Sequence, residues 1–124
     1  MNIVDIIRIS LVVIVLFFIL KRFLPVDGMK VITSEELNER LKHPTKYQFI
    51  DVSIAREYKN FHIKGFKSMP LRRIKRDAHQ LSKEKETVII CQSGHISKEA
   101  CRRLKKLGFT DLTIVKGGVS MWRK

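Results

Sequence analysis

The chain has 124 residues, of which 44% are hydrophobic, and it carries a formal net charge of +13. This length accommodates one globular domain of ordinary size and excludes a second. Two cysteines are too few for a disulfide scaffold, and the four histidines are scattered without metal-ligand spacing, so neither a disulfide framework nor a metal site is predicted.

Residues 1–24 are predicted to form a transmembrane helix. The stretch 9–20 is almost wholly apolar, and extension over 3–24 reaches the roughly 20 residues that a spanning helix needs. A cleaved signal peptide would have a basic start and a small-residue cleavage site, and the sequence has neither. A core helix of the soluble domain would have a polar stripe, which this stretch also lacks. Lys21, Arg22 and Lys30 follow the apolar stretch. The excess of basic residues on that side predicts a single-pass protein of the cell membrane whose soluble domain is cytoplasmic.

After a linker at 25–28, residues 29–124 alternate between short apolar runs, typical of buried strands, and segments with helical spacing. Thr33 and Glu36 have the spacing of a capping box at the start of a helix. This alternation predicts an α/β domain: a small parallel sheet flanked by helices on both faces. The expected strands are 29–32, 47–52, 66–69, 87–90 and 111–115, and the expected helices are 34–41, 55–60, 71–81, 97–107 and 119–122.

Cys91 lies between an apolar strand at 87–90 and the start of a helix at 97. The carboxyl ends of parallel strands are where ligands collect in such sheets. Backbone N–H groups of a tight loop and of a first helical turn lack intrahelical partners and converge on negative charge, including that of a thiolate. Cys91 is therefore the candidate nucleophile, although a free cysteine is often an inert buried thiol.

Most of the positive charge belongs to residues 29–124. Anionic lipid, nucleic acid and small anions are the three classes of partner that such charge attracts. The basic runs at 71–76 and 102–106 have no accompanying aromatic stacking pattern, so no nucleic-acid binding is expected. Attraction of a tethered domain to the anionic leaflet of the membrane is the simplest use of this charge.

Several short segments resemble those of the rhodanese-like domain family, in the same order and spacing over residues 29–122. They are Phe-Ile-Asp-Val at 49–52 with Arg-Glu-Tyr at 56–58, His-Ile-Lys-Gly at 62–65, Met-Pro-Leu at 69–71, Cys-Gln-Ser-Gly at 91–94, Leu-Gly-Phe at 107–109 and Gly-Gly-Val at 117–119 with Trp122. The resemblance implies a sulfurtransferase or sulfur carrier, without a cofactor, in which Cys91 forms a persulfide and passes sulfur to a thiol acceptor. The sulfur donor it implies is thiosulfate or a protein or low-molecular-weight persulfide. The implied substrate-binding loop is Gln92, Ser93, Gly94, His95, Ile96 and Ser97.

Three positions depart from the pattern that many members share. Ser53 and Ile96 stand where arginines are usual, and Phe61 replaces a glycine. A guanidinium at position 96 would hydrogen-bond the thiosulfate dianion, and its loss removes about 1.5–3 kcal/mol of charged hydrogen bonding. We therefore expect weak use of thiosulfate. A persulfide is less demanding, because backbone N–H groups alone hold its single sulfur anion.

The other polar candidates have supporting roles. Asp51, at a strand end, is expected to accept N–H bonds from its loop. Ser93 either donates its hydroxyl to the sulfur or shapes the turn, and His95 either assists the reaction or faces solvent. Cys101 is expected to be a small core residue. A phosphatase is disfavoured, because the sixth residue after Cys91 is Ser97 and no arginine closes the loop. Two further alternatives stay open: a binding module without turnover, and a redox-sensing thiol at Cys91.

Overall fold

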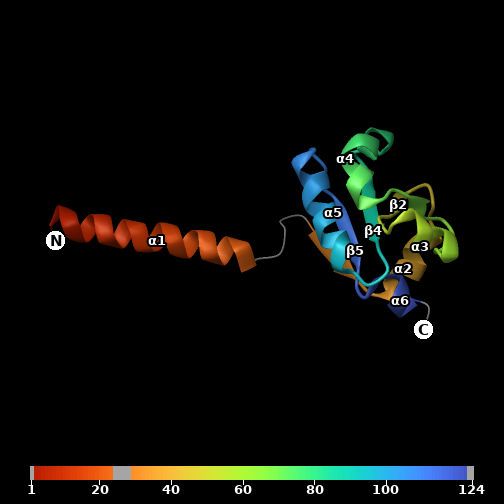
Figure 1. Cartoon of the computed structure of the whole chain (residues 1–124), viewed down its shortest axis with the longest axis horizontal. Helices are drawn as coiled ribbons and strands as arrows, with labels where there is room; N and C mark the ends of the chain where they lie inside the picture. The colour runs from red at the N-terminus through yellow and green to blue at the C-terminus, as the bar shows by residue number, and fades with distance from the viewer. Residues whose placement is uncertain (1, 24–28, 123–124) are drawn as a thin grey trace.

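The structure is a computed structural model that describes residues 2–23 and 29–122. It consists of an N-terminal helix, α1 (Ile3–Phe23), and an α/β domain that begins with strand β1 at Met29 (Figure 1). Over Ile3–Leu20, α1 has a mean hydropathy of 2.9 and buries none of this window against the rest of the chain. It is long and apolar enough to cross a membrane. The predicted linker at 25–28 lies outside the described residues.

All five strands of the domain run parallel in one sheet, in the order β1-β5-β4-β2-β3. Because both faces of a parallel sheet are covered, its strands are continuous apolar runs, which is the pattern in this sequence. Strand β4 is central, so the residue that follows it emerges at the middle of the carboxyl edge. The strands are β1 (Met29–Ile32), β2 (Tyr47–Asp51), β3 (Lys67–Ser68), β4 (Glu86–Ile90) and β5 (Leu112–Val115).

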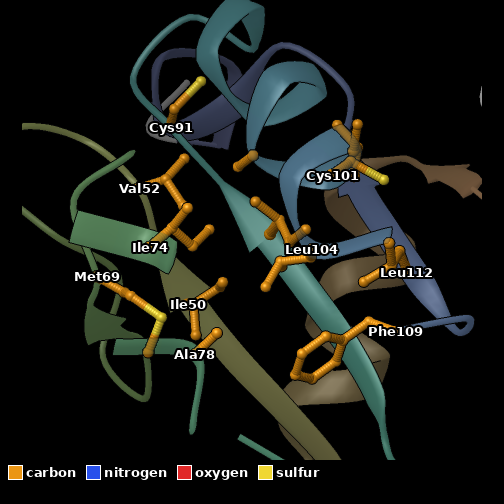
Figure 2. Close-up of a cluster of buried hydrophobic side chains, with 13 residues drawn as sticks. Ile50, Val52, Met69, Ile74, Ala78, Cys91, Cys101, Leu104, Phe109 and Leu112 are labelled. Atoms are coloured by element: carbon orange, nitrogen blue, oxygen red, sulfur yellow. The ribbon is translucent and has the colours of Figure 1, made fainter. Parts of the chain in front are cut away.

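Helices cover both faces of the sheet, as predicted. Helices α4 and α5 lie on one face, where Ile74, Ala100 and Leu104 are buried with Ile50 and Ile89 of the strands (Figures 1 and 2). Helices α2 and α6 lie on the other, where their side chains pack with alternate strand residues. The helices of the domain are α2 (Ser34–Leu41), α3 (Ala55–Asn60), α4 (Ile74–Asp77), α5 (His95–Lys106) and α6 (Gly118–Trp122).

Two helices differ from the sequence-based expectation. The segment 71–81 is broken into three short pieces, a 3-10 turn (Leu71–Arg73), α4, and a second 3-10 turn (Ala78–Gln80). Such short pieces are held by packing rather than by helix propensity, and Ile74 and Ala78 supply that packing. Helix α5 begins at His95, two residues earlier than expected, after Gly94 in the left-handed conformation at φ +94°. The loop between β4 and α5, which begins at Cys91 and which we call the Cys91 loop, is correspondingly shorter.

Glu86 joins three elements at the end of the sheet opposite Cys91. Its carboxylate lies 2.7 Å from Lys30 Nζ of β1 and 2.6 Å from Arg40 Nε of α2, and its side chain is only 11% exposed. Burial alone would raise the pKa of Glu86, but the hydrogen bonds from Lys30 and Arg40 hold it below its ordinary value of 4.5. The charged form of Glu86 therefore stabilises the fold.

We expect Glu86→Gln to destabilise the domain by about 1–2 kcal/mol at neutral pH, because it removes charge from two hydrogen bonds. Since the folded-state pKa is lowered, this contribution is present above pH 4.5 and is lost as the pH falls through the folded-state value. Urea unfolding of both proteins across that range measures the difference. A gap that stays constant down to the lowest pH would contradict a role for the Glu86 charge.

Candidate active site

Cys91 is the first residue after the central strand β4 and lies at the carboxyl edge of the sheet. Its side chain is fully buried in the cluster under α4 and α5, beside Val52 of the neighbouring segment (Figure 2). The backbone N–H of Val52 donates to Ile90 O at 2.9 Å, so the pairing of the two strands continues to the edge. The site therefore has a rigid base and a loop above it.

Two groups of the loop contact the sulfur. The N–H of Gly94 donates to Cys91 Sγ at 3.0 Å, and Ser97 Oγ lies 3.6 Å from the same atom. The Ser97 hydroxyl donates to Gly94 O at 2.9 Å, which fastens the first turn of α5 to the loop. A backbone N–H aimed at the sulfur can hydrogen-bond the sulfur of a thiolate or of a persulfide.

A second segment holds the loop from behind. The N–H of Val119 donates to Cys91 O at 2.9 Å, and Ser120 donates to Gln92 O through both its N–H, at 3.0 Å, and its hydroxyl, at 2.8 Å. Gly118, which precedes them at φ +61°, packs directly against these two carbonyl groups. We call the residues Gly118, Val119 and Ser120 the clamp. The pair of glycines after the last strand was the sequence signal for a close approach, but sequence reasoning did not link it to the site.

The structure separates the loop residues that sequence analysis grouped together. Ser93 and His95 are exposed, and the hydroxyl beside the sulfur is that of Ser97 rather than Ser93. Ile96 is half-buried and packs against the cluster that contains Cys91. Gln92 is also half-buried, and its Nε2 atom has no hydrogen-bond partner among the described residues.

Asp51 lies at the end of β2, next to the site, and is fully buried. Its Oδ1 accepts the N–H of Ser53 at 2.9 Å, the kind of loop contact that its position predicts. Its Oδ2 has no hydrogen-bond partner within residues 2–23 and 29–122. Tyr58 lies within electrostatic reach: burial raises the pKa of Tyr58, and the Asp51 carboxylate raises it further. Asp51 is therefore hydrogen-bonded to the segment that follows β2, beside Cys91.

Cys101 has a different environment from Cys91. It lies on the sheet-facing side of α5, fully buried, and both cysteines are free thiols (Figure 2). Burial raises the pKa of Cys101 to about 11, although Lys105 and Arg102 oppose this shift. Cys101 is thus a protonated core residue at neutral pH. No group of three His, Cys, Asp or Glu side chains in the described part of the chain could hold a metal ion.

Comparisons with known proteins agree with this geometry. YqhL of Bacillus subtilis, described as uncharacterized, is 32% identical over 94 residues, which cover 76% of this chain and 72% of that protein. The putative sulfur carrier protein YrkF of the same organism is 32% identical over 91 residues; these cover 73% of this chain but only 49% of YrkF. The chain therefore spans about half the length of that relative.

Solved structures show the same fold. A rhodanese-like domain protein from Staphylococcus aureus superposes with a TM-score of 0.70 at 29% identity, over 76% of this chain and 91% of that one. A family model described as "Rhodanese-like domain" matches residues 33–124. This range contains the Cys91 loop, the clamp and every strand of the sheet except β1. The chain belongs to the rhodanese-like domain family.

Proposed function

We propose that the protein is a sulfurtransferase or sulfur carrier in which Cys91 accepts and delivers one sulfur atom. The Cys91 thiolate attacks the outer sulfur of a donor persulfide, R–S–SH. A new S–S bond forms on Cys91, the donor S–S bond breaks, and its electron pair leaves on R–S⁻. The observation that carries this proposal is the contact of Cys91 Sγ with the Gly94 N–H, with the Ser97 hydroxyl close by.

The transfer to an acceptor reverses the same chemistry. An acceptor thiolate attacks the outer sulfur of the Cys91 persulfide, and Cys91 leaves as the thiolate. Because Cys91 is fully buried, the loop above it must open for each exchange. The printed names of two relatives, a putative sulfur carrier and a sulfurtransferase of Allochromatium vinosum, support this class of reaction.

We also propose that α1 anchors the domain to the cell membrane and that the domain is cytoplasmic, with boundaries at 1–24, 25–28 and 29–124. The exposed apolar side chains of α1 support the anchor. The basic residues Lys21, Arg22 and Lys30 support the orientation. The mass of the mature protein tests the alternative, since a signal peptide would be missing from it.

The decisive measurement is the intact mass of the full chain, isolated in detergent with its thiols protected. The added mass of one sulfur atom, mapped by peptide analysis to Cys91, is expected after incubation with a low-molecular-weight persulfide. Cys101 is the internal control, because its raised pKa keeps it protonated. The proposal fails if Cys91 stays unmodified with thiosulfate, a low-molecular-weight persulfide and a cysteine desulfurase, while the denatured chain reacts normally.

The choice of donor leads to a prediction at Ile96. We expect the wild-type protein to take sulfur from persulfides but only weakly from thiosulfate, and Ile96→Arg to raise the rate with thiosulfate by about tenfold or more. The reason is the charged hydrogen bonding of about 1.5–3 kcal/mol that a guanidinium offers a dianion. The comparison is made from initial rates of sulfur loading with each donor, measured with the same fraction of Cys91 in the thiolate form.

Ile96→Gln is the matched control, because it introduces a long polar side chain without charge at the same half-buried position. Equal gains from arginine and glutamine would mean that loosened packing, not the guanidinium, admits thiosulfate. Rapid loading of the wild-type protein by thiosulfate would contradict the expectation directly.

A further inference from the structure

A groove of about 400 Å³ opens beside the Cys91 loop. It lies between the first turns of α5 and the strands β1 and β5, of which β1 is the edge strand. Its floor is apolar and consists of the paired residues Val31 of β1 and Ile114 of β5. Val31 is 55% exposed although it lies on the sheet face that α5 covers, because β1 is an edge strand and α5 does not reach over it. The groove is thus an apolar surface left open next to the site.

The walls of the groove are basic. Lys98 on α5 and Lys116 after β5 line it, together with His95. No carboxylate is among the lining residues, and neither lysine has an ion pair within the described parts of the chain. Two ammonium groups on different walls above an apolar floor are complementary to an organic molecule with two anionic groups on an aliphatic body.

The groove shares its wall with the Cys91 loop. Gly94 lines the groove, and its N–H donates to Cys91 Sγ. Gly117 also lines it and directly precedes the clamp, which binds the carbonyl groups of Cys91 and Gln92. A molecule in the groove would therefore touch both segments that enclose the sulfur.

The size of the groove selects a small molecule over a protein. Its volume lies near the lower end of the roughly 300–1,000 Å³ typical of small-molecule sites. A stable protein partner would bury on the order of 800 Å² of the surface of this domain, so its contacts would extend well beyond the groove.

We propose that this groove binds the sulfur acceptor, and that the acceptor is a low-molecular-weight thiol carrying two carboxylates. This inference rests on the proposed function. Lys98 and Lys116 hold the carboxylates, and the apolar floor holds the body of the molecule. When the loop opens, the acceptor thiolate attacks the outer sulfur of the Cys91 persulfide. The new S–S bond forms in the acceptor persulfide, the bond to Cys91 Sγ breaks, and its electron pair stays on Cys91.

Discharge of preloaded protein tests the proposal. The full chain in detergent is loaded with inorganic polysulfide, freed of excess, and discharged with mercaptosuccinate, which has two carboxylates, or with neutral mercaptoethanol. At equal thiolate concentration we expect mercaptosuccinate to react faster. Lys98→Ala/Lys116→Ala is expected to slow mercaptosuccinate about five- to tenfold and mercaptoethanol less than twofold. High salt is expected to reduce the wild-type preference.

Lys75→Ala/Lys106→Ala is the matched control, because it removes the same charge from α4 and from the far end of α5. It is expected to leave both rates unchanged. Equal slowing by the two double variants would overturn the proposal, since general attraction to a basic domain would then explain the preference. A wild-type protein that does not distinguish the two thiols would overturn it as well.

A binding measurement separates this proposal from sulfur chemistry. Cys91→Ser protein is titrated with 2-(methylthio)succinate, which has no thiol, and the backbone amide signals of Gly94 and Lys116 are followed by NMR. Saturable shifts that disappear in the Lys98→Ala/Lys116→Ala background are expected. Absence of saturable shifts would overturn the groove as a dicarboxylate site, whereas failure of polysulfide to load Cys91 would instead count against the proposed function.

Discussion

Cys91→Ser is expected to abolish sulfur loading completely, because a hydroxyl forms no persulfide and the other cysteine is a protonated core residue. The fold is expected to persist. Serine has nearly the size of cysteine, and its oxygen still accepts the Gly94 N–H that Cys91 Sγ accepts at 3.0 Å. Burying the hydroxyl costs about 1–2 kcal/mol. Intact mass after exposure to a low-molecular-weight persulfide measures loading, and urea unfolding measures stability.

Cys101→Ser is the control for this experiment. It lies in the interior of α5, where a serine hydroxyl can bond the carbonyl group one turn earlier, and it is expected to retain full loading. Sulfur found on Cys101 in the Cys91→Ser protein would refute the assignment of the nucleophile. A cellular phenotype that survives Cys91→Ser would favour a binding module over sulfur transfer.

The strands were predictable because a strand buried on both faces of a sheet appears in the sequence as a short, continuous apolar run. The run before Cys91 contains Val88, Ile89 and Ile90, all fully buried, and the strand lies in the middle of the sheet. The helix after the loop was also predictable. Its buried residues Ser97, Ala100, Cys101 and Leu104 recur at helical spacing. Together these two patterns predicted a cysteine at the carboxyl edge of a parallel sheet.

Ser97 was predicted as a site residue only through the family resemblance, although the same spacing also contained a signal for it. A serine in phase with three core residues must point inward, toward the end of the strand where Cys91 lies. The expected helix start at Ser97 concealed this, because a residue at a helix start is not read as part of the buried face. With the start at His95, Ser97 falls in the first turn and its hydroxyl reaches 3.6 Å from the sulfur.

Contacts between distant segments were beyond sequence reasoning. The clamp meets the Cys91 loop only because β4 and β5 are neighbours and each continues into a turn on the same edge. The groove beside α5 depends likewise on β1 lying at the edge of the sheet, where α5 does not cover Val31. Neither strand order nor helix coverage follows from the local pattern of one strand.

Gly118→Ala is expected to destabilise the domain by about 3 kcal/mol or more and to eliminate sulfur loading. A Cβ at this position would lie 2.1 Å from Cys91 O and 2.9 Å from Gln92 O, and the backbone sits at φ +61°, where side chains are strained. Both neighbours are backbone atoms, so relief requires the clamp and the loop to separate. The hydrogen bonds from Val119 and Ser120 to these carbonyl groups would then be lost.

Gly65→Ala distinguishes this clash from backbone strain alone. Gly65 has φ +102°, but its Cβ would meet only Leu41 Cδ2 at an ordinary 3.5 Å, in a turn outside the clamp and the Cys91 loop. We expect it to cost about 1–2 kcal/mol and to leave loading intact. Thermal unfolding and intact mass, measured in parallel on the full chain in detergent, compare the two variants.

If Gly118→Ala unfolds no earlier than Gly65→Ala and still loads sulfur, the clamp does not position Cys91. If it loses loading below its unfolding temperature, the contact of Gly118 with the Cys91 carbonyl group is what holds the sulfur within reach of the Gly94 N–H.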